Sequence, residues 1–166
     1  MPVTTDIVRT FRSPRGVMRE KLAGGPREDR LIATLIIACF LNFVAQWPVH
    51  ARAAALDPSI PLEARLGGAL MAWLFIVPLA AYVVAAGTHV IARLVGGKGS
   101  WFGARLALFW ALLAASPLWL LNGLVGGMIG PGPGLSAVGL VAFFTFAAFW
   151  GFGLWEAEFG EDGAGK

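Results

Sequence analysis

The chain has 166 residues, of which 57% are hydrophobic and only 14% are charged. An ordinary soluble domain carries about 25% charged residues, so this composition excludes that class and indicates a membrane protein. Membrane spans and short connections take up nearly all of the length, which leaves no room for a separate soluble domain.

Residues 1–29 form a basic segment that we expect to lie in the cytoplasm. They lack the long apolar stretch of a secretory signal peptide, so we expect the N-terminus to be kept and the first span to insert the protein. Two short amphipathic helices are predicted here. Thr4 or Thr5 caps the first, and Ser13 with Pro14 opens the second. Their apolar positions are Ile7, Val8, Phe11, Val17, Met18 and Leu22.

A basic amphipathic segment that a following span holds at the membrane should lie at the level of the lipid headgroups. Anionic headgroups would then neutralise its basic side chains. The alternative that the sequence leaves open is docking on a cytoplasmic protein. The candidate contacts with the lipid surface are Arg12, Arg15, Arg19 and Lys21.

Three runs without charged side chains follow, at residues 31–51, 66–92 and 106–155. A helix needs about 20 apolar residues to cross the hydrocarbon core of a bilayer. The first two runs therefore supply one span each, and the third has length for two. We predict an all-α integral membrane protein whose polytopic domain, residues 30–155, has about four transmembrane helices, at about 30–48, 68–93, 102–125 and 135–155.

Proline and glycine predict where these helices end or bend. Trp47 followed by Pro48 should end the first span, with a short surface helix at 50–56. Pro78 should bend the second span, and Pro117 lies near the middle of the third. The inner and outer turns are expected at 96–101 and 130–134.

The orientation follows from the basic residues, because lysine and arginine close to spans are retained in the cytoplasm. Residues 1–30 and the connection at 93–105 hold ten of the 13 Lys and Arg residues. Four spans also return the acidic tail at 156–166 to that side. We therefore predict a multi-pass protein of a bacterial inner membrane, with both termini in the cytoplasm.

Small residues four positions apart let helices in lipid approach one another closely. We favour packing within the chain, and association with a second copy is the alternative. The pairs with this spacing are Gly123 with Gly127, Gly126 with Gly130, and Ala147 with Gly151.

Neutral polar side chains, without charged ones, occupy the centres of the predicted spans. We favour a structural role for them, as hydrogen-bonding groups between helices, over the alternative of a solute path. The absence of Asp, Glu, Lys and Arg from the span centres counts against a proton-coupled transporter. The candidate intramembrane positions are Asn42, Gln46, Tyr82 and Asn122.

Residues that could form a reactive site are few. His50 and His89 are predicted near opposite membrane faces, and neither has a second ligand at metal spacing; we expect His89 to end the second span at the inner interface. Cys39 is the single cysteine, which excludes an intramolecular disulfide. We therefore predict no catalytic residue, no metal, no cofactor and no nucleic-acid partner.

A basic segment opened by Ser13 and Pro14, a Gly-Gly-Lys-Gly-Ser-Trp turn from Gly96 and a Ser-Pro break at Pro117 occur in this order. In this arrangement the chain resembles bacterial members of the Ypt-interacting protein (YIP) family, over about residues 8–155. The resemblance implies a multi-span helical fold and a membrane location. Eukaryotic members are associated with small GTPases and membrane shaping, but no GTPase-binding residue is carried over to this chain. Members often have five spans, whereas we count four.

Two classes of function compete. The leading hypothesis is a YIP-like, non-enzymatic protein that organises the lipid bilayer through anionic headgroups, or scaffolds other membrane proteins or itself. The alternative is a small transporter or channel component with a neutral polar path. An enzyme acting on lipid ranks third, because the acids and bases for such chemistry are missing from the predicted spans.

Overall fold

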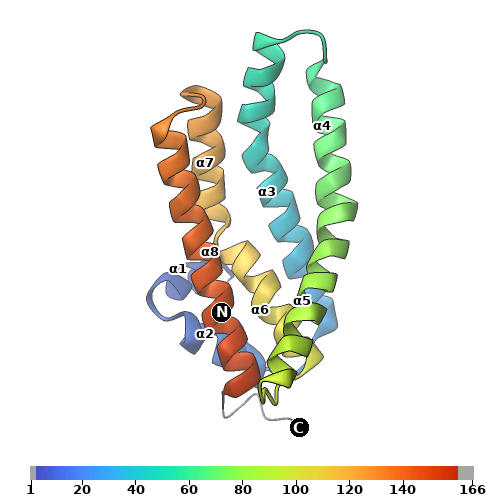
Figure 1. The fold of residues 1–166 in the computed structure, drawn as a ribbon, viewed down its shortest axis with the longest axis vertical. Helices are drawn as coiled ribbons and strands as arrows, with labels where there is room; N and C mark the ends of the chain where they lie inside the picture. Colours follow the sequence, from blue (N-terminus) through green and yellow to red (C-terminus); the bar gives the residue numbers. More distant parts are fainter. Residues whose placement is uncertain (1–2, 161–166) are drawn as a thin grey trace.

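The computed structural model describes residues 3–160, and every regular element in that range is helical (Figure 1). The predicted all-α class is confirmed. The helices are α1 (Val3–Arg12), α2 (Pro14–Ala23), α3 (Glu28–Leu56), α4 (Leu62–Met71), α5 (Val77–Leu94), α6 (Trp101–Ala114), α7 (Ser116–Met128) and α8 (Pro133–Phe159), and a π-helical segment, η1 (Ala72–Ile76), joins α4 to α5.

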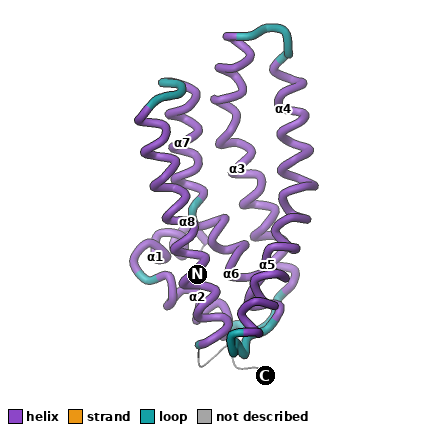
Figure 2. Tube along the Cα trace, in the orientation of Figure 1, coloured by secondary structure: helices purple, strands orange, loops and turns teal. Residues whose placement is uncertain are grey.

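The long helices place their turns at two ends of the molecule (Figures 1 and 2). What we call the lower end is the lower half of the molecule in Figure 1: the turn at residues 95–100 and the last turns of α8 lie at its tip, and α2 and then α1 lie above them. The upper end holds the turns at residues 57–61 and 129–132. The two basic regions of the sequence therefore lie at the same end, although they are far apart along the chain.

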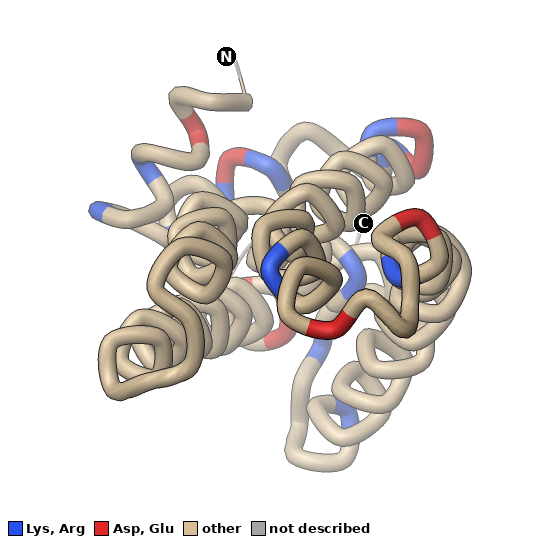
Figure 3. Tube along the Cα trace, turned by 90° about the horizontal axis from the view of Figure 1, so that it is seen from above, with Lys and Arg blue, Asp and Glu red and all other residues tan. Residues whose placement is uncertain are grey.

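Three helical stretches are long and apolar enough to cross a membrane: α3, the stretch Leu62–Leu94 and α8; α6 with α7 makes a fourth if the bent pair is one span. Only 33%, 17% and 17% of their apolar windows are buried inside the protein, and a soluble monomer rarely exposes so much apolar surface. Charged positions are nearly absent along them (Figure 3). These helices fit a membrane protein.

Helix α3 continues through Pro48 to Leu56, so the helix stop predicted at Trp47 and Pro48 is wrong. The surface helix expected at 50–56 is the continuation of the same helix. Proline removes one backbone hydrogen bond, but neighbouring helices make this tolerable in a membrane. Here Pro48 packs directly against α7, where a Cβ on Gly127 would overlap its side chain.

Pro78 lies in the first turn of α5, directly after η1. A π-helical turn accommodates an extra residue in an otherwise regular helix, and proline is tolerated in a first turn because its missing N–H has no partner to lose. The second span therefore has a π-helical segment directly before Pro78, the residue at which we predicted a bend.

The predicted break at Pro117 is confirmed, because α6 and α7 differ in direction by 42°. The hydroxyl of Ser116 donates to the carbonyl of Leu113 at 2.8 Å, which satisfies one group at the end of α6. The break leaves α6 in the lower half of the molecule and α7 in the upper half.

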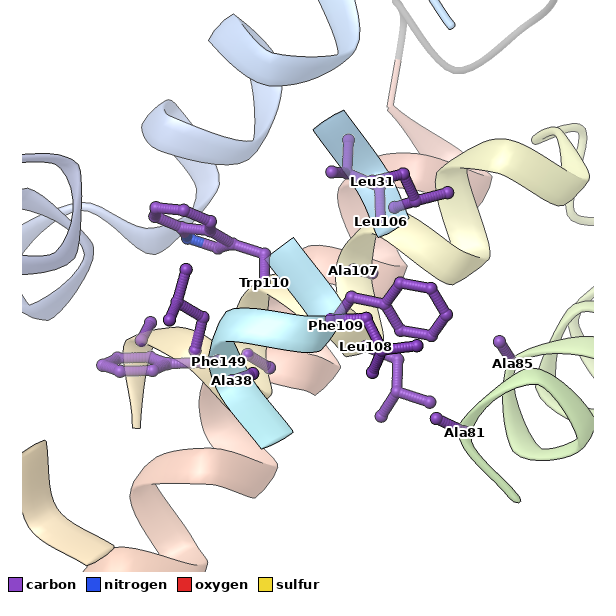
Figure 4. Close-up of a cluster of buried hydrophobic side chains, with 14 of the residues drawn as sticks. Leu31, Ala38, Ala81, Ala85, Leu106, Ala107, Leu108, Phe109, Trp110 and Phe149 are labelled. Carbon is purple, nitrogen blue, oxygen red and sulfur yellow. The ribbon is translucent and has the colours of Figure 1, made fainter. Parts of the chain in front are cut away.

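Helix α6 is the centre of the lower half, where it contacts α3, α5 and α8. Its buried residues lie on all sides of the helix, as is typical of a central helix. Figure 4 shows Phe109 and Trp110 leaving α6 in opposite directions, with Phe109 on the side of Ala81 and Ala85. The core therefore links α5 on one side of α6 to the N-terminal helices on the other.

Candidate functional site

The N-terminal hairpin, α1 with α2, folds onto α6 and α8. Trp110 of α6 donates its indole N–H to the hydroxyl of Thr10 at 3.1 Å. Phe11 packs edge-on against Phe149 of α8, with 5.0 Å between the ring centroids. Both predicted N-terminal helices are confirmed, and they are part of the folded domain. The cap predicted at Thr4 or Thr5 is wrong, because α1 already includes both residues.

Protein covers the apolar face of α2, which corrects the prediction that this face lies among lipid headgroups. Val17 and Met18 are each 1% exposed. Met18 packs at Gly153 of α8, where a Cβ would lie 2.9 Å from the methionine methyl group. In α1, Val8 and Phe11 stay 62% and 47% exposed. The apolar side chains that the hairpin offers to lipid are therefore those of α1.

Two of the four predicted lipid contacts, Lys21 and Arg19, are paired with acidic side chains of the protein. The Lys21 ammonium lies 3.0 Å from Asp6 and 3.7 Å from the centroid of the Trp110 ring. Arg19 pairs at 2.8 Å with Glu156, which is buried in α8. Lys21 therefore anchors α2 to α1 and α6, and Arg19 anchors it to α8.

Two further cations, Arg9 and Arg15, also contact side chains of the protein. Arg9 donates to Glu20 at 2.5 and 2.9 Å, and this hydrogen bonding raises the pKa of Arg9 and lowers the pKa of Glu20. Arg15 lies over the ring of Phe152, 5.2 Å from its centroid. Six cations have no ion-pair partner within residues 3–160, and we call them the unpaired lower-end cations: Arg12, Arg15, Arg27, Arg30, Arg93 and Lys98.

A buried acid and base join α5 to α8 at the lower end. His89 Nδ1 lies 2.5 Å from Glu158 Oε1, and both residues are 1% exposed. The Trp101 ring covers the imidazole, with 4.4 Å between centroids. Glu158 Oε2 is buried without a hydrogen-bond partner among the described residues. Removing one member of the pair leaves a buried polar group of the other without its partner, which is costly, so each residue depends on the other.

The glycine-rich turn at residues 95–100 packs on the end of α8. A Cβ on Gly99 would overlap the carbonyl oxygen of Ala157. The backbone N–H of Lys98 donates to the carbonyl of Glu158 at 2.8 Å. Gly99 therefore allows the backbone of the turn to lie close to the backbone of α8.

Sequence reasoning missed the pair because it assigned Glu156 and Glu158 to an acidic tail. Helix α8 continues to Phe159 and buries both carboxylates, so the predicted tail does not begin at 156; residues 161–166 lie outside the described range. His89 lies at the expected end of α5, but inside the protein. The sequence did offer one indication that the helix continues to Glu158, because no glycine or proline lies between residues 154 and 158 to end it.

A cavity of about 520 Å³ lies in the upper half, between α3, η1, α6, α7 and α8. This volume is typical of small-molecule pockets. Three of the four predicted polar positions line it, Asn42, Gln46 and Asn122, together with His50. The aromatic part of the lining consists of Trp73, Trp119, Phe143 and Phe146.

The side-chain amides of Asn42 and Asn122 at this upper cavity differ in their hydrogen bonding. Asn42 donates to the carbonyl of Ala38 at 2.8 Å, within its own helix. Asn122 Oδ1 is buried without a hydrogen-bond partner in the described part of the chain. A ligand or a water molecule could therefore donate to Asn122. Tyr82 does not line the cavity and packs edge-on against Phe109, 5.1 Å between centroids.

The small residues of α7 pack within the chain, as we favoured. A Cβ on Gly123 would overlap the carbonyl oxygen of Ala45. Gly130, at φ +93°, lies against the guanidinium of Arg52, which also reaches carbonyls at the end of α7 at 3.5 Å. A Cβ on Gly151 meets open space, so its surface on α8 is not used in this way.

No family model, curated protein or solved structure gives a significant match to this chain. The resemblance to the YIP family therefore stays a prediction.

Proposed function

We propose that this chain is a non-enzymatic, multi-pass protein of a bacterial inner membrane, which organises anionic lipid and neighbouring membrane proteins at the cytoplasmic surface. The resemblance to the YIP family implies the multi-span fold and the membrane location of such a protein. In it, the lower end and both termini face the cytoplasm.

The distribution of basic side chains carries this proposal. Ten of the twelve Lys and Arg residues within 3–160 belong to the two segments of the lower end, and six of these are the unpaired lower-end cations. At the upper end, Arg52 contacts carbonyls of α7 and Arg65 pairs with Asp57 at 3.5 Å. Basic residues near spans are retained in the cytoplasm, where anionic lipids attract each one with about 1 kcal/mol.

The N-terminal hairpin supports a role in organising lipid, because it holds cations at a fixed place beside the spans. Arg12 ends α1, which Thr10 ties to α6, and Arg15 begins α2, which Arg19 ties to α8. Cations on a flexible tail would attract lipid without ordering it. Cations on an anchored hairpin can gather headgroups around one side of the bundle.

The non-enzymatic part of the proposal is supported by the surroundings of the buried acid and base. His89 and Glu158 are each 1% exposed, and Trp101 covers the imidazole. A substrate would have to displace packed side chains to reach them. We assign the pair to fastening α5 and α8 together.

The test is a comparison of spin-labelled lipids around the protein in vesicles of phosphatidylglycerol and phosphatidylcholine. We expect more motionally restricted phosphatidylglycerol than phosphatidylcholine. The preference should disappear when Arg12, Arg15, Arg27 and Arg30 are changed to glutamine, and persist in the upper-end control R52Q/R65Q. Equal restriction of both lipids by the unchanged protein would contradict the proposal.

The upper cavity favours a second candidate, transport of a small neutral polar solute. Its amide side chains sit among aromatic ones, and Asn122 Oδ1 lacks a donor. Flux of glycerol or urea into proteoliposomes tests this function. Transport should be lost in N122L and Q46L and kept in Y82F, because Tyr82 lies outside the cavity. Flux no greater than in protein-free liposomes would exclude transport of these solutes.

A further inference from the structure

A second cavity, the lower groove, has a volume of about 590 Å³. It lies between the N-terminal hairpin, the linker that follows α2, the first turns of α3 and the face of α6. Its lining changes character along its length, with charged residues beside the linker and apolar residues along α3 and α6. An occupant that matches both parts must be amphiphilic.

The charged part of the lower groove has an excess of one cation. Its lining includes three basic residues, Lys21, Arg27 and Arg30, and two acidic ones, Asp6 and Glu20. Lys21 is 3.0 Å from Asp6, and Glu20 is hydrogen-bonded to Arg9. Both carboxylates are therefore neutralised by neighbours, and the remaining two cations are available to an anion.

Arg27 and Arg30 are well placed to hold one phosphodiester. Both are exposed, and neither has an ion-pair partner within residues 3–160. Arg27 directly precedes α3 and Arg30 lies in its first turn, and both line the same groove. The adjacent Glu28 is engaged by Arg105, at 2.5 and 3.1 Å. Guanidinium groups bind phosphate oxygens by charge-assisted, bidentate hydrogen bonds.

The apolar part continues from these arginines along the helix axes. Ile37 lies seven residues beyond Arg30, which is a rise of about 10 Å along α3. Leu106 and Leu113 of α6 line the groove over the same rise. Because α3 is a candidate span, this wall runs from the lower end into the bilayer, which is the direction of an acyl chain below its headgroup.

We propose that the lower groove binds one anionic glycerophospholipid of the adjacent leaflet, with its phosphodiester at Arg27 and Arg30 and one acyl chain along Ile37, Leu106 and Leu113. A phosphodiester brings one negative charge to the two remaining cations, Arg27 and Arg30, so a headgroup without a cation of its own, such as that of phosphatidylglycerol, fits better than a zwitterionic one. The inference rests on the proposed function, since it names a bound lipid at the same lower end.

Native mass spectrometry of protein released from nanodiscs with equal amounts of phosphatidylglycerol, phosphatidylethanolamine and phosphatidylcholine tests the proposal. One retained phosphatidylglycerol is expected. Changing Arg27 and Arg30 to glutamine should lower its retention about tenfold or more, because charge-assisted hydrogen bonds are lost. The matched variant R12Q/R15Q, which removes two cations outside the groove, should retain it.

Filling the groove without changing its charge gives a second, independent arm. Ala33 lines the groove and is exposed, whereas Ile36 is an exposed residue of α3 outside it. We expect Ala33→Trp to displace the lipid and Ile36→Trp to retain it. Circular dichroism and gel filtration show whether each variant is folded. Glycerol phosphate, added as a free headgroup, should not displace the lipid, because it lacks an acyl chain.

The outcomes separate this inference from the proposed function. Equal loss of phosphatidylglycerol in R27Q/R30Q and R12Q/R15Q would overturn the groove and leave a general attraction of anionic lipid in place. Retention of the other two lipids as strongly as phosphatidylglycerol would overturn the assigned class. Displacement by glycerol phosphate alone would reduce the groove to an anion site. If the unchanged protein retains no lipid, the inference that the lower groove binds one is refuted. The spin-label comparison would then test the proposed function by itself.

Discussion

The lower and upper halves of the molecule are held together by different chemistry. In the lower half, polar pairs join helices that are far apart along the chain: Thr10 with Trp110, Arg19 with Glu156, and His89 with Glu158. In the upper half, α3 and α7 meet through glycines, and the backbone of Ala45 occupies the space that a side chain at Gly123 would need.

This difference follows from the position of each half relative to lipid. Where helices have lipid as a neighbour, the hydrophobic effect does not favour one helix over an acyl chain, so association depends on close packing and on hydrogen bonds. Charged groups are tolerated toward the ends of spans and are costly in the middle. We therefore expect the lower half to be sensitive to changes of charge and the upper half to be sensitive to added volume.

The largest effect is expected for His89→Ala. The substitution leaves Glu158 buried without its partner, which typically costs about 3–5 kcal/mol. Unfolding by sodium dodecyl sulfate in mixed micelles measures the change in the free energy of unfolding. The double variant H89L/E158L is the control, because replacing both members with apolar residues is often nearly neutral. A loss below about 1 kcal/mol in His89→Ala would contradict a tightly coupled pair.

The next effect tests the upper half, by adding a single methyl group. Gly123→Ala places a Cβ on the carbonyl oxygen of Ala45, so α3 and α7 must move apart. We expect a loss of about 2–3 kcal/mol, in the upper part of the range for overpacking. Gly151→Ala is the matched control in α8, where the added methyl meets open space and should change stability by about 0.5 kcal/mol or less. Equal effects of the two would show that the close approach of α3 and α7 is unimportant.

A smaller effect is expected for Thr10→Val, which removes the acceptor of the Trp110 indole N–H. The loss should be about 1 kcal/mol, the typical net value of one hydrogen bond. It should appear as faster hydrogen exchange in α1 and α2, with little change in α7. Thr4→Val, at an exposed position of the same helix, should leave exchange unchanged. Unchanged exchange in Thr10→Val would mean that the hairpin is held without this bond.

The smallest effect is a pH dependence of the N-terminal hairpin. The hydrogen bond from Arg9 holds the pKa of Glu20 below its ordinary value. Because this pKa is lowered, the ionised Glu20 side chain stabilises the fold at any pH above the ordinary pKa of glutamate. The stabilisation is lost as the pH falls through the lower pKa of the folded state, below about pH 4. A spin label at the exposed position Val8 should become more mobile in that range. Glu20→Gln should remove that part of the change, and an identical pH response in this variant would refute the assignment.

Sequence patterns predicted the helical class, the two N-terminal helices and the break at Pro117, because hydropathy and local proline chemistry determine them. They did not predict that α3 continues through Pro48. This proline packs against Gly127 of α7, and a contact between two helices far apart in the sequence cannot be seen in the local pattern. In lipid, a helix is less readily ended by proline than in water.

The candidate sites were predicted in part. Asn42, Gln46 and Asn122 were identified as polar residues inside spans, and the structure brings them to one cavity because α3 and α7 pack together. Tyr82 carries the same kind of signal but lies elsewhere. The pair of His89 and Glu158 was missed because a long-range contact between α5 and α8 has no local signature in the sequence.

We expect the long helices to cross a membrane and to hold both basic segments on its cytoplasmic side. Labelling of single cysteines at positions 12, 98 and 59, in a Cys39→Ala background and with a membrane-impermeant maleimide, tests this orientation. In cells whose outer membrane alone is opened, we predict labelling at position 59, with positions 12 and 98 reacting only after the inner membrane is permeabilised. Labelling of 12 and 98 on opposite sides, or recovery of the protein as a monomer without detergent, would contradict the claim.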